Sequence, residues 1–427
     1  MDESAEWQAV ELNAGFPRKY CSTRHNAGMP ETQAGEGTLS PPPLPSRVRR
    51  LLLASGLGAS LGPLARGAPA RADQRAGLAK RRLLFPRDFG SHPELQTEWW
   101  YITGHCLTGS GAQARGLGFQ LTFFRVRVDN TQAMQSRFAA KQLLFAHAAV
   151  TDVLGQRFWH DQRIARQGFE LAFASELDTA LRLRDWSLVR QGGVYAARIT
   201  AADFELHLSF TETQPLLLQG DNGLSRKGPA ATQASYYYSQ PQLAFQGTIT
   251  LQGQRFAVAA DGAGSANSGF SPGRGAAWLD HEWSDGLMPP DAVGWDWIGM
   301  NLYDGSALMA FQMRDKAGNA VWDGGAFRHP AIGADKATIF SRGEAIFQPL
   351  RSWKSPLTQA SYPVEWLVRT PADNYIVRAL LDKQELDSRG STGAVYWEGL
   401  CELLDGNRRP VGRGYLEMTG YAKPLVL

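Results

Sequence analysis

The pattern of apolar and polar positions predicts strands along almost the whole chain after residue 82. Apolar and polar residues alternate with a period of two in short runs, and turn-forming residues separate these runs. This period is typical of half-buried β-strands, whereas a helix would repeat every 3.6 residues. Examples are residues 142–151, 157–164, 193–200, 204–210, 243–251 and 254–259. One segment, residues 131–140, is predicted as a short helix.

Two tryptophan-rich stretches indicate that the chain contains the same structure twice. Residues 98–104 and 294–299 each contain two tryptophans, and each is followed by a second apolar run, at 118–124 and at 307–313. Aromatic residues at the start of a meander tend to line the mouth or wall of a barrel. The two halves are therefore predicted to form two related, aromatic-lined antiparallel containers.

Later landmarks repeat in the same order and support a domain duplication. In the first half they are Trp186, Tyr195, residues 203–210, Tyr236 to Tyr238, residues 247–251 and residues 255–258. Their expected counterparts are Trp353, Tyr362 with Trp366, residues 373–381, Tyr396 with Trp397, residues 399–403 and residues 412–421. Prolines at 289 and 290 would break any strand, so we place the junction at residues 286–292 and expect domains at 83–287 and 288–427.

The first 72 residues resemble targeting sequence. Residues 1–46 are polar and rich in Pro and Gly, and we expect them to be disordered or a non-native extension, with Met29 as the true start. Residues 47–72 contain a cationic region, a short apolar region and Ala-x-Ala cleavage sites, which is typical of a signal peptide. We therefore expect export to the periplasm or beyond, by the twin-arginine or the ordinary route, and a soluble mature protein.

Composition narrows the range of partners. With 44 basic and 41 acidic residues the net charge is only +3, which argues against nucleic acid as a partner. Histidines occur without any metal-binding spacing, so neither a metal nor another cofactor is predicted. Of the cysteines, Cys106 and Cys401 would remain after cleavage; they could form a disulfide, or both could be buried free thiols.

The densest cluster of reactive groups lies at residues 278–284. In an extended chain, alternation places His281 and Trp283 on one face, and Asp280 and Glu282 on the other. An imidazole beside a large π surface suits proton transfer next to a developing cation. The structural alternative is that the carboxylates satisfy turn amides and that the histidine is a hydrogen-bonded core residue.

Two further candidates lie in the first half of the chain. Glu98, inside the first aromatic stretch, could act as an acid, and His147 could contact a ligand. The structural alternatives are a carboxylate bonded to backbone or arginine and a histidine that only completes a hydrogen bond.

Long motifs in fixed order resemble the carotenoid 1,2-hydratase and AttH-like family. The sequence letters are EWWYITG at 98–104, LQGDNGLSRKG at 218–228, YYSQP at 237–241, WLDHEWS at 278–284 and GWDW at 294–297. The resemblance covers about residues 85–421. It implies an all-β fold of two lipocalin-like (calycin) antiparallel β-barrels in tandem, and lipocalin barrels enclose a small apolar ligand.

The resemblance also implies a function and residues that carry it. Asp280, His281 and Trp283 match the family's Asp-His-x-Trp motif, in which Trp283 would stabilise a cation and His281 would handle water. The hydratases use a Tyr and an Asp two positions apart; here Asp304 is present, but Leu302 stands two positions earlier. The residues expected around the ligand are Glu98, Trp99, Trp100, Tyr101, His147, Tyr237, Trp295 and Trp297. A second departure is the Gly- and Ser-rich insertion at 261–275.

Two functions follow from this combination. The first is an exported enzyme that binds a hydrophobic isoprenoid-like or lipid ligand and hydrates a carbon–carbon double bond by acid–base catalysis. The second is a non-catalytic periplasmic lipid or lipoprotein carrier that works with an envelope ABC-type exporter. Both need the same apolar cavity, and the sequence leaves the ligand and the oligomeric state open.

Overall fold

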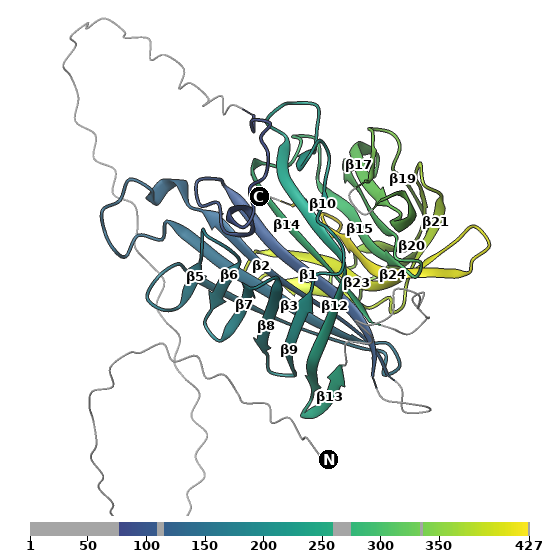
Figure 1. The fold of residues 1–427 in the computed structure, drawn as a ribbon, viewed down its shortest axis with the longest axis horizontal. Coiled ribbons are helices and arrows are strands. Elements are labelled where there is room, and N and C mark those ends of the chain that lie inside the picture. Colours follow the sequence, from purple (N-terminus) through teal and green to yellow (C-terminus); the bar gives the residue numbers. More distant parts are fainter. Residues whose placement is uncertain (1–76, 109–114, 259–274, 334–335, 426–427) are drawn as a thin grey trace, which may run out of the picture. The chain divides into compact units, whose positions relative to one another are not determined.

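The computed structural model describes residues 77–108, 115–258, 275–333 and 336–425, which form two β-sheets and three short 3-10 helices (Figure 1). The first sheet contains β1 (Thr97–Thr108), β2 (Arg115–Arg127), β3 (Gln142–Asp152), β4 (Arg157–Arg166), β5 (Ala172–Ala174), β6 (Ala180–Leu183), β7 (Trp186–Gln191), β8 (Val194–Thr200), β9 (Phe204–Thr211), β10 (Leu217–Leu218), β11 (Leu224–Arg226), β12 (Ala234–Leu251), β13 (Gln254–Val258) and β14 (Ala276–Gly286). The second contains β15 (Gly294–Leu302), β16 (Ala307–Arg314), β17 (Ala320–Arg328), β18 (Thr338–Phe340), β19 (Ile346–Lys354), β20 (Ser361–Arg369), β21 (Asn374–Ala379), β22 (Glu385–Ser388), β23 (Ala394–Leu404) and β24 (Pro410–Met418). The 3-10 helices are η1 (Arg87–Phe89), η3 (Asp129–Thr131) and η4 (Pro330–Ile332).

The two sheets have 14 and 10 strands and share the same arrangement around the opening strand, as a duplicated fold requires. The first sheet runs β4-β3-β2-β1-β14-β12-β9-β8-β7-β6-β5, and the second runs β18-β17-β16-β15-β24-β23-β21-β20-β19. In each, the opening strand pairs with the last strand, and two meanders extend from this pair in opposite directions. The predicted all-β fold of two lipocalin-like barrels in tandem is confirmed.

The last pair of landmarks in the predicted duplication is wrong. Residues 255–258 form β13, which pairs with the distal half of β12. The counterpart of β24 is β14, because each of these strands closes its sheet against the opening strand. A short hairpin strand and a closing strand have the same alternation, so their sequences could not distinguish them.

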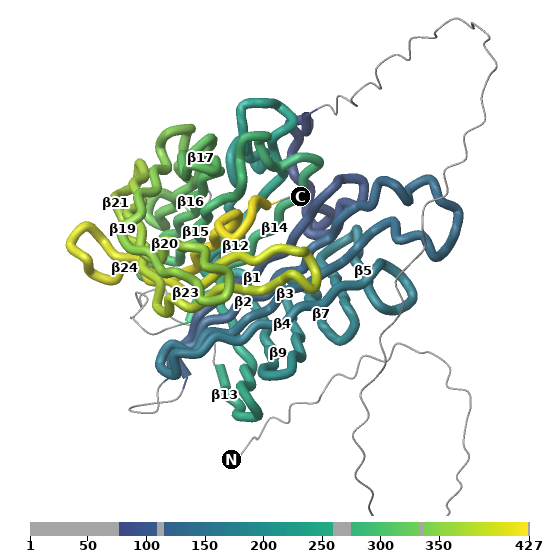
Figure 2. Tube along the Cα trace, turned by 180° about the vertical axis from the view of Figure 1, so that it is seen from behind, coloured from purple at the N-terminus to yellow at the C-terminus, as the bar shows by residue number. Residues whose placement is uncertain are grey.

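Side-chain alternation gives the described residues three large apolar cores and one small cluster. One face of β1, β12 and β14 points into the first sheet, where Trp100, Tyr238 and Trp283 are buried. The equivalent face of the second sheet buries Ile298, Trp397 and other apolar residues. The opposite faces meet in a third core between the sheets. Strands β23 and β24, yellow in Figure 2, contact β2 and β1 there.

The structure tests two local predictions, those for residues 131–140 and for the two cysteines. The helix expected at 131–140 is wrong, because this segment is irregular apart from the end of η3. Thr131 Oγ1 donates to the carbonyls of Val128 and Ala140 and closes the segment into a loop. Cys106 and Cys401 are both free and buried. The expected leader at 1–72 and most of the insertion at 261–275 lie outside the described residues.

Candidate functional site

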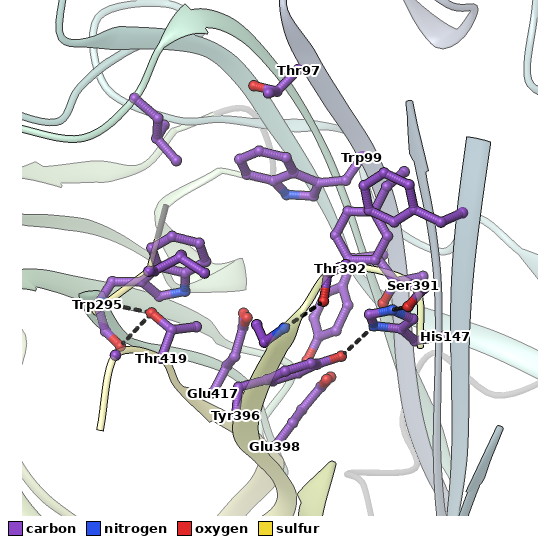
Figure 3. A pocket seen from close by; sticks show the side chains of 18 of the residues that line it. Thr97, Trp99, His147, Trp295, Ser391, Thr392, Tyr396, Glu398, Glu417 and Thr419 are labelled. Atoms are coloured by element: carbon purple, nitrogen blue, oxygen red, sulfur yellow. Dashed lines mark hydrogen bonds between the residues drawn. The ribbon is translucent and has the colours of Figure 1, made fainter. Parts of the chain in front are cut away.

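A cavity of about 660 Å³ lies between the two sheets (Figure 3). Its walls come from β1, β2, β3 and β14 on one side and from β15, β16, β23 and β24 on the other. The sequence predicted containers inside the barrels instead. The first interior is filled by large side chains, among them Trp100, Trp186 and Trp283, each at most 1% exposed. A close-packed interior of this kind leaves little space for a ligand.

Apolar and aromatic side chains form most of the cavity wall. Trp99, Phe124 and Phe145 lie on neighbouring strands of the first sheet, and Trp295 and Trp297 lie on the opening strand of the second. In Figure 3, Trp99 and Trp295 occupy opposite sides of the open space. Walls of this composition favour an apolar ligand.

Asp280 of β14 lines the cavity and takes part in a chain of hydrogen bonds that crosses to the second sheet. Asp280 accepts bonds from Tyr237 Oη at 2.8 Å, from Ser239 Oγ at 2.5 Å and from Trp278 Nε1 at 2.8 Å. Trp297 Nε1 donates to Tyr237 Oη at 3.1 Å and so links the second sheet to this group. Burial raises the pKa of Asp280 to about 7, although the three donors favour the ionised form.

Two more carboxyl groups come from the second sheet. Glu398 of β23 and Glu417 of β24 are directly opposite each other across the strand pair. Burial, together with the charge of its neighbour, raises the pKa of Glu398 well above its usual value. Burial and the nearby carboxylates Asp280 and Glu282 raise the pKa of Glu417 to about 7. Near neutral pH these groups can therefore hold protons inside an apolar cavity.

A buried lysine also lines the cavity. Lys227, in the loop after β11, places its Nζ 3.1 Å from Glu282 Oε1. The same ammonium lies 4.8 Å from the ring centroid of Tyr237 and 4.2 Å from that of Phe311. Glu282 is also hydrogen-bonded by Ser235 Oγ.

A histidine of the first sheet and a tyrosine of the second meet at the cavity wall. His147 Nδ1 lies 2.8 Å from Tyr396 Oη, and its Nε2 lies 2.8 Å from Ser391 Oγ. Figure 3 shows this group beside Glu398. Burial lowers the pKa of His147 to about 3, so the imidazole is neutral at physiological pH.

The opposite face of β14 carries a separate network. Glu98 accepts hydrogen bonds from His92 Nδ1 at 2.7 Å, His281 Nε2 at 3.0 Å and Arg125 Nε at 2.8 Å. His281 Nδ1 lies 3.1 Å from Tyr238 Oη. Burial would raise the pKa of Glu98, but the bonds from His281 and His92 hold it well below its usual value.

This network could in principle hold a metal ion, because one ligand atom each from His92, Glu98 and His281 lies within 4.8 Å of the other two. The short imidazole–carboxylate contacts and the adjacent Arg125 guanidinium account for these groups without one. A fixed cation beside the carboxylate opposes the binding of a second cation. We therefore interpret the set as a hydrogen-bonded charge network.

Comparison with known proteins identifies the family of this chain. The family model described as AttH-like matches residues 76–421, which is nearly the whole described region. The chain belongs to the AttH-like family. The family predicted from the sequence motifs is thereby confirmed. No curated protein matches the chain.

Two solved structures are similar to this AttH-like chain. A Nitrosomonas europaea protein assigned as an AttH has 44% sequence identity and a TM-score of 0.70, and the match covers 81% of this chain and 99% of that one. Kievitone hydratase from Nectria haematococca has 12% identity and a TM-score of 0.59, with 82% of this chain and 96% of that one covered. At that low identity the second similarity shows the fold alone.

In this AttH-like protein, most site residues expected from the sequence line the cavity, and the others lie inside the first sheet or in an exposed turn. The cavity is lined by Asp280, Glu98, Trp99, Tyr101, His147, Tyr237, Trp295 and Trp297. His281, Trp283 and Trp100 instead pack inside the first sheet. Asp304 lies in the exposed turn after β15, where its carboxylate is 3.7 Å from His329. The carboxylate of Glu98 belongs to the buried network.

Sequence reasoning missed several residues of the cavity in this AttH-like protein. They are Lys227, Tyr396, Glu398 and Glu417. Lys227 lies within one of the family-like motifs, and Glu398 follows Tyr396 at the spacing that puts both on one face of a strand. The sequence signal for Glu398 was an acidic residue within a largely apolar strand.

Among the described residues, no helix is long and apolar enough to cross a membrane.

Proposed function

We propose that this AttH-like protein binds a hydrophobic, isoprenoid-like or lipid ligand in the cavity between its sheets and hydrates a carbon–carbon double bond by acid–base catalysis. One observation carries the proposal: carboxyl groups with pKa values raised to about 7 line a cavity with aromatic walls. The fold shared with kievitone hydratase agrees with a reaction of this class.

The chemistry needs one acid, one base and a surface that tolerates positive charge. The Glu417 carboxylic acid gives its proton to one alkene carbon, and the π electrons form the new C–H bond. The other carbon becomes a tertiary cation, which the indole faces of Trp295 and Trp297 stabilise. Water then attacks this cation, and the Asp280 carboxylate accepts the proton that the water loses.

Two carboxyl groups with similar raised pKa values suit this division of roles. Near pH 7 a population with one group protonated and the other ionised is always present. An activity profile with a maximum near neutral pH would follow. His281 has no direct part in this proposal, because its ring is held between Glu98 and Tyr238 on the opposite face.

The test uses an acyclic isoprenoid with a terminal double bond and mass spectrometry of the products. The proposal expects a product heavier by one water, and Glu417→Gln should lower the rate about 100- to 10,000-fold because an amide cannot donate that proton. Glu176→Gln, at an exposed carboxylate, is the matched control and should leave the rate unchanged. Full turnover in Glu417→Gln would remove this residue from the mechanism.

Carriage without catalysis is the second candidate function. The observation that favours it is the extent of the apolar wall, which includes Ile164 of β4 as well as Leu425. An exported carrier of this kind would receive or deliver a lipid beside an envelope ABC-type exporter. Native mass spectrometry of the purified protein should then show a retained lipid, and an empty protein that hydrates an isoprenoid would exclude this candidate.

A further inference from the structure

Two exposed phenylalanines stack on each other between the loop before β3 and the loop after β4. Phe138 and Phe169 are 64% and 40% exposed, and their ring centroids lie 5.5 Å apart with an interplanar angle of 18°. Met134, Leu171 and Phe173 add exposed apolar side chains along the same two segments. Single exposed apolar residues are normal, whereas a contiguous group indicates a surface that another molecule covers.

Arginines lie over these rings. The guanidinium carbon of Arg166 lies 4.1 Å from the ring centroid of Phe169, and that of Arg137 lies 5.7 Å from the same centroid. Residues 131–141 and 164–173 together contain three basic side chains and one acidic side chain. The two phenylalanines and these two arginines therefore form a basic aromatic patch.

The backbone holds the patch in place at a conformational cost. Arg166 Nη1 donates to the carbonyl of Phe138 and ties one loop to the other. Phe169 has a φ of 56°, a left-handed conformation that is rare for a bulky residue. Glycine or asparagine would adopt it with less strain. A strained turn that presents an exposed aromatic ring indicates a function for that ring beyond the fold.

The patch adjoins the cavity between the sheets. In the β3–β4 pair, Ile164 is directly opposite Phe145, and Arg166 is directly opposite Leu143. Residues directly opposite each other in an antiparallel pair project to the same face. Leu143, Phe145 and Ile164 line the cavity, and Ile164 is 38% exposed. The apolar wall of the cavity therefore continues along β4 to Arg166 and the patch.

From these observations we infer that the basic aromatic patch docks the protein on an anionic phospholipid bilayer, from which an apolar ligand enters the cavity past Ile164. Exposed aromatic rings insert at the boundary between head groups and acyl chains, and basic side chains attract anionic head groups. Guanidinium groups also form two-point hydrogen bonds with phosphate. The inference rests on the proposed function only in that the cavity takes an apolar ligand.

Flotation with lipid vesicles tests the docking surface. The purified protein is mixed with vesicles of phosphatidylcholine alone or of phosphatidylcholine with phosphatidylglycerol, and the fraction that floats is measured. Binding to the anionic vesicles should be at least about 10-fold stronger, because each Lys or Arg near such a surface adds attraction. Added salt should weaken it. Equal binding to the two kinds of vesicle overturns the inference.

Variants locate the attachment. Arg137→Glu should lower binding to the anionic vesicles about 10-fold, and Phe138→Ser should lower it about 5-fold. The matched control is Arg342→Glu, which changes the net charge by the same amount at an exposed arginine 5.1 Å from the ring centroid of Trp322 in the second sheet. The control should bind as the wild type does. Equal losses in Arg137→Glu and Arg342→Glu would show attraction by the overall charge and overturn the patch.

The route of the ligand and the proposed function have separate readouts. With an isoprenoid embedded in anionic vesicles, Arg137→Glu should slow hydration about 10-fold, in step with its weaker binding, whereas in detergent micelles it should equal the wild type. A protein that hydrates the isoprenoid in micelles but does not float with anionic vesicles overturns the docking surface alone. A protein that floats through the patch but hydrates nothing in either medium overturns the proposed catalysis and keeps the docking surface.

Discussion

Carboxyl groups lie on both sides of β14, and the two sides differ in charge pairing and in the pKa values of these groups. Toward the first interior, His281 contacts Glu98, which also binds His92 and Arg125, so every charge has a partner. Toward the cavity, burial and the charges of neighbouring carboxylates raise the pKa values of Asp280, Glu398 and Glu417. A saturated network stabilises the fold, whereas groups with raised pKa values can exchange protons.

The largest effect on stability should come from removing Glu98, the carboxylate at the centre of the fully paired network. Glu98→Ala should destabilise the protein by about 3–5 kcal/mol, because it leaves the buried Arg125 guanidinium without its carboxylate. Urea unfolding followed by circular dichroism measures the loss. Glu176→Ala at the surface is the control, and an equal change in both variants would contradict the assigned role.

The next largest effect should come from the cavity face. The pKa of Asp280 is about 7 in the folded protein, whereas its ordinary value of 3.8 holds in the unfolded chain, so the folded state binds more protons between these values. This group therefore costs stability that grows as the pH rises from about 4 to about 7, and the cost stays beyond it.

Asp280→Asn removes that titration. Relative to the wild type, the variant should gain about 2–3 kcal/mol in free energy of unfolding between pH 5 and pH 8. Unfolding curves of both proteins at pH 5 and pH 8 give the stability difference between variant and wild type at each pH. The change in this difference with pH is the test, because a loss of hydrogen bonds that is the same at both pH values cancels. A constant offset at the two pH values would show that Asp280 is ionised at both.

A smaller effect should follow from cutting the hydrogen-bond chain between the sheets. Tyr237→Phe removes the hydroxyl that joins Trp297 to Asp280, and should cost about 1–2 kcal/mol. Tyr303→Phe, at a half-buried side chain in the turn after β15, is the matched control. Thermal melts of both variants give the comparison, and equal melting temperatures would mean that the Tyr237 hydroxyl adds nothing to stability.

The smallest effect should be that of a reducing agent. Cys106 lies in the first core and Cys401 in the second, and burial raises the pKa of both thiols, that of Cys106 to about 12. The melting temperature should be the same with and without dithiothreitol, and the folded protein should react with a thiol reagent only slowly. A drop in melting temperature on reduction would reveal a disulfide.

Local patterns were sufficient for much of the architecture. Period-two alternation predicted the strands, and repeated aromatic landmarks predicted the duplication and the lipocalin-like fold. Alternation also placed His281 and Trp283 on one face of β14 and Asp280 on the other, as observed. It could not show which face borders a cavity, because both faces of this strand are buried.

The sequence by itself determined the strands, the repeat and the family, because each depends on neighbouring residues or on motifs read in order. Only the tertiary structure decided where the cavity lies and which acids line it. Glu417 comes more than a hundred residues after Asp280, and the two approach each other only because β24 packs against the outer face of β1. Packing between two sheets depends on the shapes of both surfaces at once, which a local pattern does not contain.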